Sequence, residues 1–431
     1  MFDRAVTDDR NCDRFARREP IVITGIGMIA SIGGDRESVW RGVREGRSAV
    51  RALSGVVAIP DGLLLGATVD DLAPCVPNRL KVITLCQRAA AEALADADLD
   101  LNEVELDRFG CAISGHMGDT GWLERHLAGY DRSAPGAPEW WQQWMPNTAC
   151  SVVANEYRLA GPRICHSVAC ASGLIDILAA VRSIRDGACD IALAGSAEAI
   201  HPLFAAGFYQ MKVLAHHDDP RQACRPFDVG RQGFVMGEGA AMFVIERLGH
   251  ALARGAPIYA ELASGKMLAE AHHVTGLDAE SEALAYAISA ALRDARLEPA
   301  DIGYVNAHGT GTVQNDLVET RGIRRAMGAA ANQLCVSATK SMLGHLVNAA
   351  GSVELAITVL ALRDAFVPPT LNLTHPDPRC DLDCIPMVGR PCRTEHALKL
   401  SVAFGGHIVA VVLRRWREAR SRAADPTLRA A

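Results

Sequence analysis

Two segments far apart in the chain repeat the same pattern, and this repetition limits the fold more than any other feature of the sequence. Residues 170–187 begin with small side chains and continue with apolar residues at helical spacing. Residues 344–363 repeat this order, and the apolar run 239–245 is echoed by 406–412. Together the echoes predict two similar α/β halves with the functional site at their junction.

Composition fits such a fold, since 49% of the 431 residues are apolar and only 5% are aromatic. The net charge of -6 argues against general nucleic-acid binding. We expect no membrane segment, because no run of about 18 apolar residues occurs and the N-terminus lacks a secretory signal. Thirteen cysteines without a CxxC motif favour a reducing cytoplasm. No histidine pair has zinc-ligand spacing, so we expect no metal.

The organisation along the chain follows from these patterns. We expect a flexible leader (1–19), a first half (20–254), a second half (255–415) and a loose basic tail (416–431). The run 21–27 is expected to be a buried strand that ends in a glycine turn. Other expected elements are helices at 37–45 and 81–97 and strands at 108–114, 190–194, 240–246 and 408–413.

Cys170 is the candidate nucleophile. A cysteine is most often a buried filler residue. Cys170, however, follows a strand-like run, has small neighbours and precedes an apolar helix. The dipole of a helix N-terminus favours the reactive thiolate. The sequence therefore predicts an exposed, acidified thiol at this turn.

Two further strand ends carry groups that suit this thiol. His308 follows the run Val305-Asn306-Ala307 and precedes a Gly/Thr turn. Lys340 follows another strand end, and His345 comes five residues later at a helix start. Because α/β folds place catalytic groups where strands lead into loops, these four residues are predicted to form one site.

From about residue 21 to 413 the sequence resembles the elongating, Cys-His-His type of β-ketoacyl-[acyl carrier protein] synthases of type II fatty acid and polyketide assembly. The motifs that carry this resemblance occur in the family's order. They are Ala169-Cys170-Ala171-Ser172-Gly173, Cys224-Arg225-Pro226-Phe227-Asp228, Gly233-Phe234-Val235-Met236-Gly237-Glu238-Gly239-Ala240, Ala307-His308-Gly309-Thr310-Gly311-Thr312 and Lys340-Ser341-Met342-Leu343-Gly344-His345.

The resemblance implies a thiolase fold, with two βαβαβαββ halves in a five-layer αβαβα architecture, and a homodimer. It implies that Cys170 accepts an acyl group and that His308 and His345 donate hydrogen bonds to the thioester oxygen of a malonyl extender. Lys340 would order the site, with Glu319 as its expected salt-bridge partner. No cofactor is expected, because both substrates travel on the phosphopantetheine of an acyl carrier protein.

The same resemblance assigns supporting residues. Phe404 is expected to gate the thiol and to supply a backbone N–H to an oxyanion hole. Other gating or pocket positions are Phe208, Glu270, His273, Gly405 and Gly406. The acidic carrier protein is expected to dock on basic side chains, with Lys212, Arg79 and Lys81 as candidates.

The C-terminal turn departs from the family pattern. It runs Ala403-Phe404-Gly405-Gly406-His407-Ile408, where the family has Gly-Phe-Gly-Gly-Thr-Asn. Isoleucine cannot make the side-chain hydrogen bonds by which asparagine ties a turn. Val168 also replaces a usual threonine. These departures predict a specialised ketosynthase.

Other functions on the same fold are weighed against this one. A degradative thiolase needs a second catalytic cysteine in the C-terminal half, and no cysteine there lies at a matching glycine-rich turn. An initiation synthase would have asparagine where His345 stands, and a silent chain-length-factor subunit would lack Cys170. Two alternatives stay open: a catalytic subunit that needs a chain-length-factor-like partner in a heterodimer, and a non-decarboxylating acyltransferase.

Overall fold

The computed structural model describes residues 19–54, 59–72, 79–115, 143 and 145–417. The predicted leader and tail lie outside these residues, apart from Glu19, Trp416 and Arg417, and the domain boundary at 254/255 stays a prediction. Among the described helices, none combines the length and the apolar character that a membrane crossing requires.

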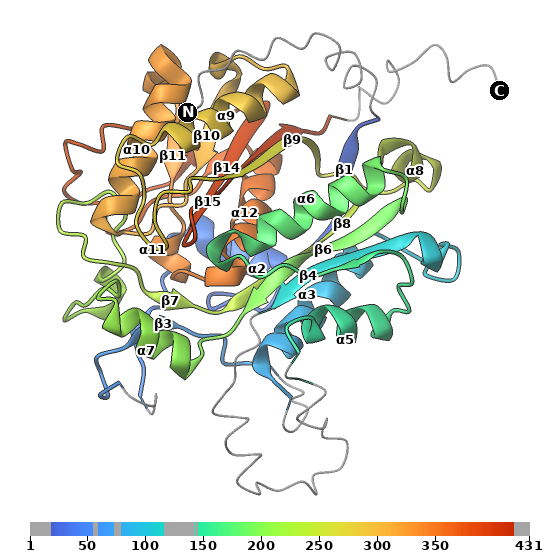
Figure 1. Ribbon diagram of the computed structural model, residues 1–431, viewed down its shortest axis with the longest axis horizontal. Helices are drawn as coiled ribbons and strands as arrows, with labels where there is room; N and C mark the ends of the chain where they lie inside the picture. The colour runs from blue at the N-terminus through green and yellow to red at the C-terminus, as the bar shows by residue number, and fades with distance from the viewer. Residues whose placement is uncertain (1–18, 55–58, 73–78, 116–142, 144, 418–431) are drawn as a thin grey trace, which may run out of the picture.

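Two sets of five strands form the centre of the molecule (Figure 1). The first set consists of β1 (Ile21–Ala30), β4 (Phe109–Gly115), β5 (Arg163–Ile164), β6 (Ile191–Glu198) and β8 (Gly239–Arg247). The second consists of β9 (Ala260–Ala269), β10 (Ile302–Asn306), β11 (Cys335–Ser337), β14 (His396–Ala403) and β15 (His407–Arg415).

The two sets have the same topology. In each, the strands lie in the order third, second, fourth, fifth, first along the chain. The third, second and fourth strands are parallel, and the remaining pairs are antiparallel. The echo of 239–245 in 406–412 is therefore confirmed, because β8 and β15 are equivalent strands. A short antiparallel contact between β1 and β9 joins the halves into one ten-stranded sheet.

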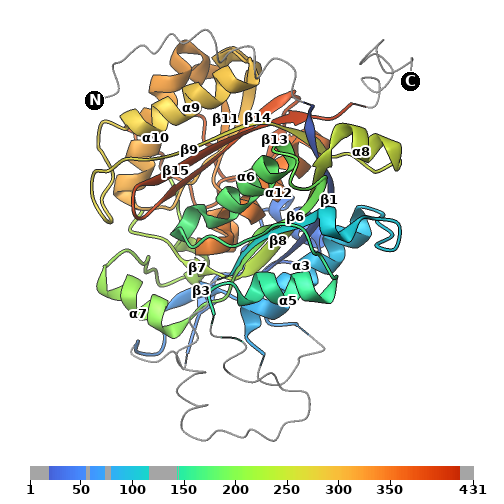
Figure 2. The same ribbon diagram turned by 45° about the vertical axis from the view of Figure 1, so that its right-hand side comes forward.

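Helices complete five layers (Figure 2). The central layer holds α6 (Ser172–Arg185) and α12 (Ala350–Asp364), which contact each other and strands of both halves. These helices are the second predicted echo, and each follows a short 3-10 turn, 169–171 and 347–349. The outer layers hold α3 (Lys81–Asp96) and α5 (Thr148–Glu156) on one side, and α9 (Glu282–Ala295) and α10 (Val313–Met327) on the other. The predicted thiolase architecture is confirmed.

Smaller elements complete the described chain. The helices are α2 (Arg36–Arg44), α7 (Pro202–Gln210), α8 (Leu248–Ala253) and α11 (Lys340–Leu343). Two small sheets consist of β2 (Arg51–Ala52), β3 (Leu65–Ala67) and β7 (Met236–Gly237), and of β12 (Phe366–Val367) and β13 (Arg390–Pro391).

The glycine turn predicted at 25–27 is wrong, because β1 continues through it to Ala30. These glycines serve close packing against α3. A Cβ atom on Gly27 would lie 1.9 Å from the carbonyl oxygen of Ala89, and one on Gly25 would lie 2.2 Å from that of Ala93. Closely spaced glycines occur both in turns and in strands that a helix approaches closely, so the sequence alone does not separate the two.

Candidate active site

Cys170 lies in the 3-10 turn that precedes α6, at the centre of the molecule. Ala169 has φ of +48°, a left-handed conformation that is strained for a residue with a side chain. Ser172 holds this turn, because its hydroxyl donates to the Ala169 carbonyl at 2.8 Å and accepts the Val168 N–H at 3.0 Å. In this turn Cys170 lines a cavity.

The thiol is not the exposed, acidified group that the sequence pattern predicted. Cys170 is only 6% exposed, and burial raises the pKa of its thiol to about 12, although the Lys340 ammonium lowers it. The sequence pattern did not show how completely the turn is buried, and desolvation disfavours a thiolate. Reaction of this sulfur therefore needs neighbouring hydrogen-bond donors.

His345 is the nearest such neighbour, with Nε2 3.0 Å from Sγ of Cys170. Its Nδ1 accepts the Val347 N–H at 3.2 Å, so the hydrogen of the neutral ring is assigned to Nε2. Burial, followed by the charges of Lys340 and Lys399, holds the pKa of His345 well below its usual range. The ring thus directs an N–H at the sulfur.

His308 faces the same point from the loop after β10. Its ring centre lies 5.2 Å from that of His345, at nearly a right angle. The Lys340 ammonium lies 3.3 Å from Nδ1 of His308, and since an ammonium can only donate, Nδ1 accepts and Nε2 carries the hydrogen. Burial and then Lys340 keep the pKa of His308 well below normal, so this ring is also neutral. The structure therefore brings both imidazoles and the thiol together.

The predicted ion pair between Lys340 and Glu319 is wrong. Lys340 pairs with Glu354 of α12 at 2.6 Å, and both side chains are at most 1% exposed. Glu319 instead accepts the backbone N–H groups of His308 and Gly309, at 2.5 and 2.7 Å. Glu319 is itself fully buried, but its partners are backbone N–H groups and not the predicted ammonium.

Two charged residues of the site were missed from the sequence. Glu354 and Lys399 are both buried and lie 2.7 Å apart. A signal was available, because each interrupts an otherwise apolar stretch, Glu354 in α12 and Lys399 in β14. A charge inside such a stretch is buried and therefore requires a partner of opposite sign.

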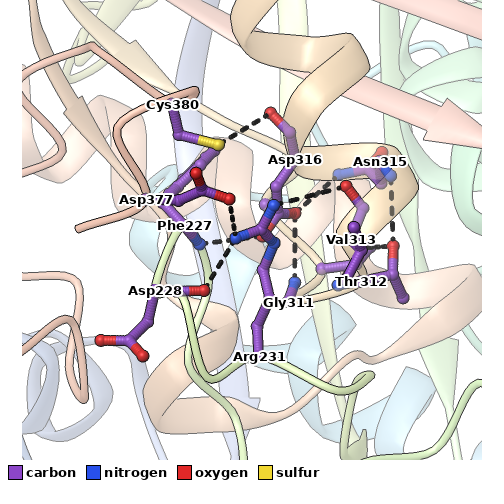
Figure 3. Close-up of polar contacts among 12 residues, drawn as sticks. Phe227, Asp228, Arg231, Gly311, Thr312, Val313, Asn315, Asp316, Asp377 and Cys380 are labelled. Atoms are coloured by element: carbon purple, nitrogen blue, oxygen red, sulfur yellow. Dashed lines mark hydrogen bonds and ion pairs between the residues drawn. The ribbon is translucent and has the colours of Figure 1, made fainter. Parts of the chain in front are cut away.

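A further buried network fixes the loop that follows His308 (Figure 3). Arg231, whose side chain is 1% exposed, contacts Asp377 at 2.9 Å and Asp316 at 3.4 Å. Asp316 accepts the N–H groups of Phe227 and Gly311. These bonds join the 224–228 motif to the Gly/Thr turn after His308, which explains why both motifs accompany the site.

A cavity of about 400 Å³ opens onto Cys170, His308 and His345. Phe208, Phe404 and His273 line it, and the ring centres of Phe208 and Phe404 are 6.4 Å apart. The expected gating residues other than Phe208 belong to two loops, around Glu270 and around Phe404, which backbone hydrogen bonds join. The Gly405 N–H donates to the Val274 carbonyl at 2.7 Å, and the Glu270 N–H donates to the Gly406 carbonyl at 2.9 Å. The two loops thus lie together at one wall of the cavity.

The unusual residues of the C-terminal turn have a packing explanation. Ile408 is fully buried within an apolar cluster of the second half, and it pairs with Val402 across β14 and β15. Ala403 pairs with His407, whose ring lies against Gly405. Apolar contacts therefore hold the turn here in place of the asparagine hydrogen bonds of the family pattern.

The three candidate docking residues lie in different surroundings. Lys212 is exposed and directly follows Met211, which lines the cavity. Lys81 forms an ion pair with the buried carboxylate of Glu238, and Arg79 donates to Gln87 at 2.7 Å. Neither Arg79 nor Lys81 lines the cavity. Docking of the carrier protein on these three residues stays a prediction.

Sγ of Cys170 and ring nitrogens of His308 and His345 lie within 4.8 Å of one another, a spacing that one metal ion could bridge. In the tautomers assigned above, however, both Nε2 atoms carry hydrogens. A metal would require a tautomer change in both rings. The arrangement is suited to donating two hydrogen bonds to one oxygen atom.

Proteins with this duplicated five-layer fold and a thiol between its halves include the thiolase-fold ketosynthases, and comparison with known proteins agrees. Residues 80–251 match the N-terminal domain of the beta-ketoacyl synthases, and residues 259–374 match their C-terminal domain. The chain therefore belongs to the beta-ketoacyl synthase family, the condensing acyltransferases of fatty acid and polyketide synthesis.

Individual relatives span nearly the whole chain. The 3-oxoacyl-[acyl-carrier-protein] synthase 2 of Coxiella burnetii is 37% identical over 406 residues, which are 92% of this chain and 98% of the relative. A type II polyketide ketosynthase, solved with its acyl carrier protein and bound to a hexaketide, is 32% identical with a TM-score of 0.85. The ishigamide ketosynthase/chain length factor is 32% identical with a TM-score of 0.83. The alignments with both structures cover 93% of this chain and 100% of the solved chain.

Proposed function

We propose that this protein extends an acyl chain by two carbons, through decarboxylative condensation of a Cys170-bound acyl thioester with malonyl-[acyl carrier protein]. The observation that carries the proposal is the convergence of two neutral imidazole N–H groups, from His308 and His345, beside the Cys170 sulfur. Such a pair stabilises an oxygen that gains negative charge at the same point.

In the first half-reaction Cys170 attacks the thioester of an acyl carrier protein. A bond forms between Sγ and the acyl carbon, and the carbon–sulfur bond to the phosphopantetheine breaks. The thiol proton of Cys170 passes to the departing phosphopantetheine sulfur. The Nε2–H of His345, at 3.0 Å, stabilises the negative sulfur while the proton leaves.

In the second half-reaction the first phosphopantetheine has left the cavity, and the malonyl group of another carrier protein enters beside the acylated Cys170. Loss of CO₂ leaves its electron pair on the α-carbon, and the negative charge spreads to the thioester oxygen. The N–H groups of His308 and His345 bind this oxygen. The carbanion then attacks the acyl carbon, the bond to Sγ breaks, and the released Cys170 thiolate takes up one proton from water.

Other residues have supporting roles in this proposal. Lys340 donates a hydrogen bond to Nδ1 of His308, so that the ring carries its hydrogen on Nε2, which faces the cavity. The backbone N–H groups of Cys170 and Phe404 serve as the second oxyanion hole. Phe208, Phe404, Glu270, His273, Gly405 and Gly406 belong to the gate, and the carrier protein docks near Lys212.

The test supplies acyl carrier protein loaded with acyl groups of several lengths and then malonyl carrier protein. The proposal predicts a β-ketoacyl product two carbons longer and one CO₂ per product. Acyl transfer between carrier proteins without CO₂ release would contradict it and would favour the non-decarboxylating acyltransferase.

A catalytic subunit that requires a chain-length-factor-like partner is the second candidate. It is favoured by the likeness to the ishigamide ketosynthase/chain length factor and by the departures at Ala403, His407 and Ile408. If Cys170 of the purified chain becomes acylated but the acyl chain is extended only after such a partner is added, the active protein is a heterodimer and not a homodimer. The departures also support a specialised pathway over general fatty acid synthesis.

A further inference from the structure

Lys399 is a buried charged residue without a role in the condensation described above. It lies on β14, in a strand whose other residues are mostly apolar, and its side chain is fully buried. Taking an ammonium group out of water costs several kcal/mol unless strong partners surround it. Its partners are therefore informative about its role.

Those partners connect Lys399 to the catalytic loop. Its ammonium contacts Oε2 of Glu354 at 2.7 Å and the Ala307 carbonyl at 3.4 Å, and it also donates to the carbonyl of Leu400. Lys340 contacts the other carboxylate oxygen, Oε1, and donates to the carbonyl of His308. One carboxylate thus orients two ammonium groups, and each ammonium holds one of two successive carbonyls of the loop.

The N–H side of the same loop is held as well. Glu319 accepts the N–H groups of His308 and Gly309. The backbone around His308 is therefore fixed from one side by a carboxylate and from the other by the pair of lysines. Any change that lets Glu354 rotate would move Lys340 away from Nδ1 of His308.

The second ammonium also sets the charge of the region. With Lys340 alone, the Glu354 carboxylate would neutralise the pair, whereas Lys399 adds a second ammonium to that one carboxylate. Lys399 contributes to lowering the pKa of both His308 and His345. This added positive charge favours neutral rings, which are the forms that keep Nδ1 free to accept.

We propose that Lys399 is a positioning residue for the condensation step: by holding Glu354 and the Ala307 carbonyl, it fixes Lys340 against His308 so that the imidazole directs Nε2–H into the cavity. The proposal rests on the proposed function. It assigns Lys399 no contact with the substrate.

The test compares the two half-reactions in Lys399→Met, which keeps the length of the side chain without its charge. Acyl transfer to Cys170 should change less than threefold, whereas extension of the pre-acylated enzyme by malonyl carrier protein should slow by up to about 100-fold. The loss should fall on the rate constant rather than on KM. Lys266→Met, which removes a 35% exposed lysine of β9, the strand on the other side of β15 from β14, is the matched control and should leave both steps unchanged.

A pH profile of the extension step gives a readout that a merely structural role would not change. Burial lowers the pKa of Lys399 to about 8. Extension by the pre-acylated wild type should therefore decline as pH rises through about 8, and Lys399→Met should lack this decline. The charged and titratable groups around the ammonium are Glu354, Lys340, Glu319, His308 and His345.

Chemical rescue provides a second variant in case the methionine protein does not fold. In Lys399→Ala, ammonium chloride should restore part of the extension rate, because NH₄⁺ can donate to the same three oxygens, whereas tetramethylammonium chloride should not. If the wild type extends the acyl chain and the Lys399 variants do so at the same rate and with the same pH profile, the positioning role is overturned. Absence of extension in the wild type would instead contradict the proposed function.

Discussion

Nε2 of His345 lies 3.0 Å from Sγ of Cys170, and because Nδ1 accepts the Val347 N–H, the hydrogen of the ring points at the sulfur. A ring in this tautomer is a hydrogen-bond donor to the site and is not a base for the thiol. In this account His345 therefore stabilises the Cys170 sulfur by donating to it, and the thiol proton leaves on the phosphopantetheine sulfur.

His308→Ala should retain acylation of Cys170 but lose extension, whereas His345→Ala should lose extension and also slow acylation, because the Nε2–H of His345 stabilises the Cys170 sulfur. Removing one donor to a developing oxyanion costs roughly 100- to 1000-fold in rate. Stopped assays of adduct formation and of product formation measure the two steps separately. If His308→Ala lost both steps in parallel, the assignment of this ring to the extension step would be wrong.

Glu354→Leu should destabilise the fold by about 3–5 kcal/mol, because it leaves two buried ammonium groups without their carboxylate. The matched control is Asp70→Ala, which removes an ion pair with Arg51 whose two side chains are 52% and 68% exposed. That variant should change stability by about 1 kcal/mol or less. Urea unfolding of both variants decides the point, and equal losses would contradict the importance of burial.

Glu319 should make stability depend on pH. Burial raises its pKa from 4.5 to about 7, so the folded protein binds this proton more tightly than the unfolded chain does. Its contribution to stability is complete below pH 4.5 and is lost as pH rises through about 7. The free energy of unfolding of the wild type should fall relative to Glu319→Gln by on the order of 3 kcal/mol over this range. Parallel pH curves for the two proteins would refute the shift.

Gly27→Ala should destabilise the protein by roughly 1–3 kcal/mol, because its Cβ would overlap the Ala89 carbonyl of α3. Gly34→Ala is the control, since no atom lies within 4 Å of its added Cβ, and it should change stability by about 0.5 kcal/mol or less. Thermal melting of the two variants tests the close contact between β1 and α3. A stable Gly27→Ala protein would mean that the strand and helix are further apart.

Much of this architecture could be predicted from the sequence because it repeats. The echoes around Cys170 and His345 are local patterns, and they correspond to equivalent helices α6 and α12 in the two halves. The catalytic candidates were recognisable because each follows a strand end. By contrast, Gly27 looks like a turn residue until the approach of α3 is known.

The electrostatics could not be predicted in the same way. The pKa of the Cys170 thiol depends on how completely later segments bury it, and the pairing of Lys340 depends on which carboxylate α12 brings near. Glu319 lies on α10, the helix that follows His308, and Glu354 lies on α12, the helix that follows His345. Only the three-dimensional packing decides that Glu354 meets the lysines and Glu319 meets the backbone.

The central claim is that Cys170 carries the growing acyl chain. The most direct measurement is the intact mass of the protein after incubation with acyl carrier protein loaded with a single acyl group. We predict an increase equal to that acyl group in the wild type, its absence in Cys170→Ala, and its disappearance from the wild type when malonyl carrier protein is added. An adduct that persists in Cys170→Ala would contradict the account.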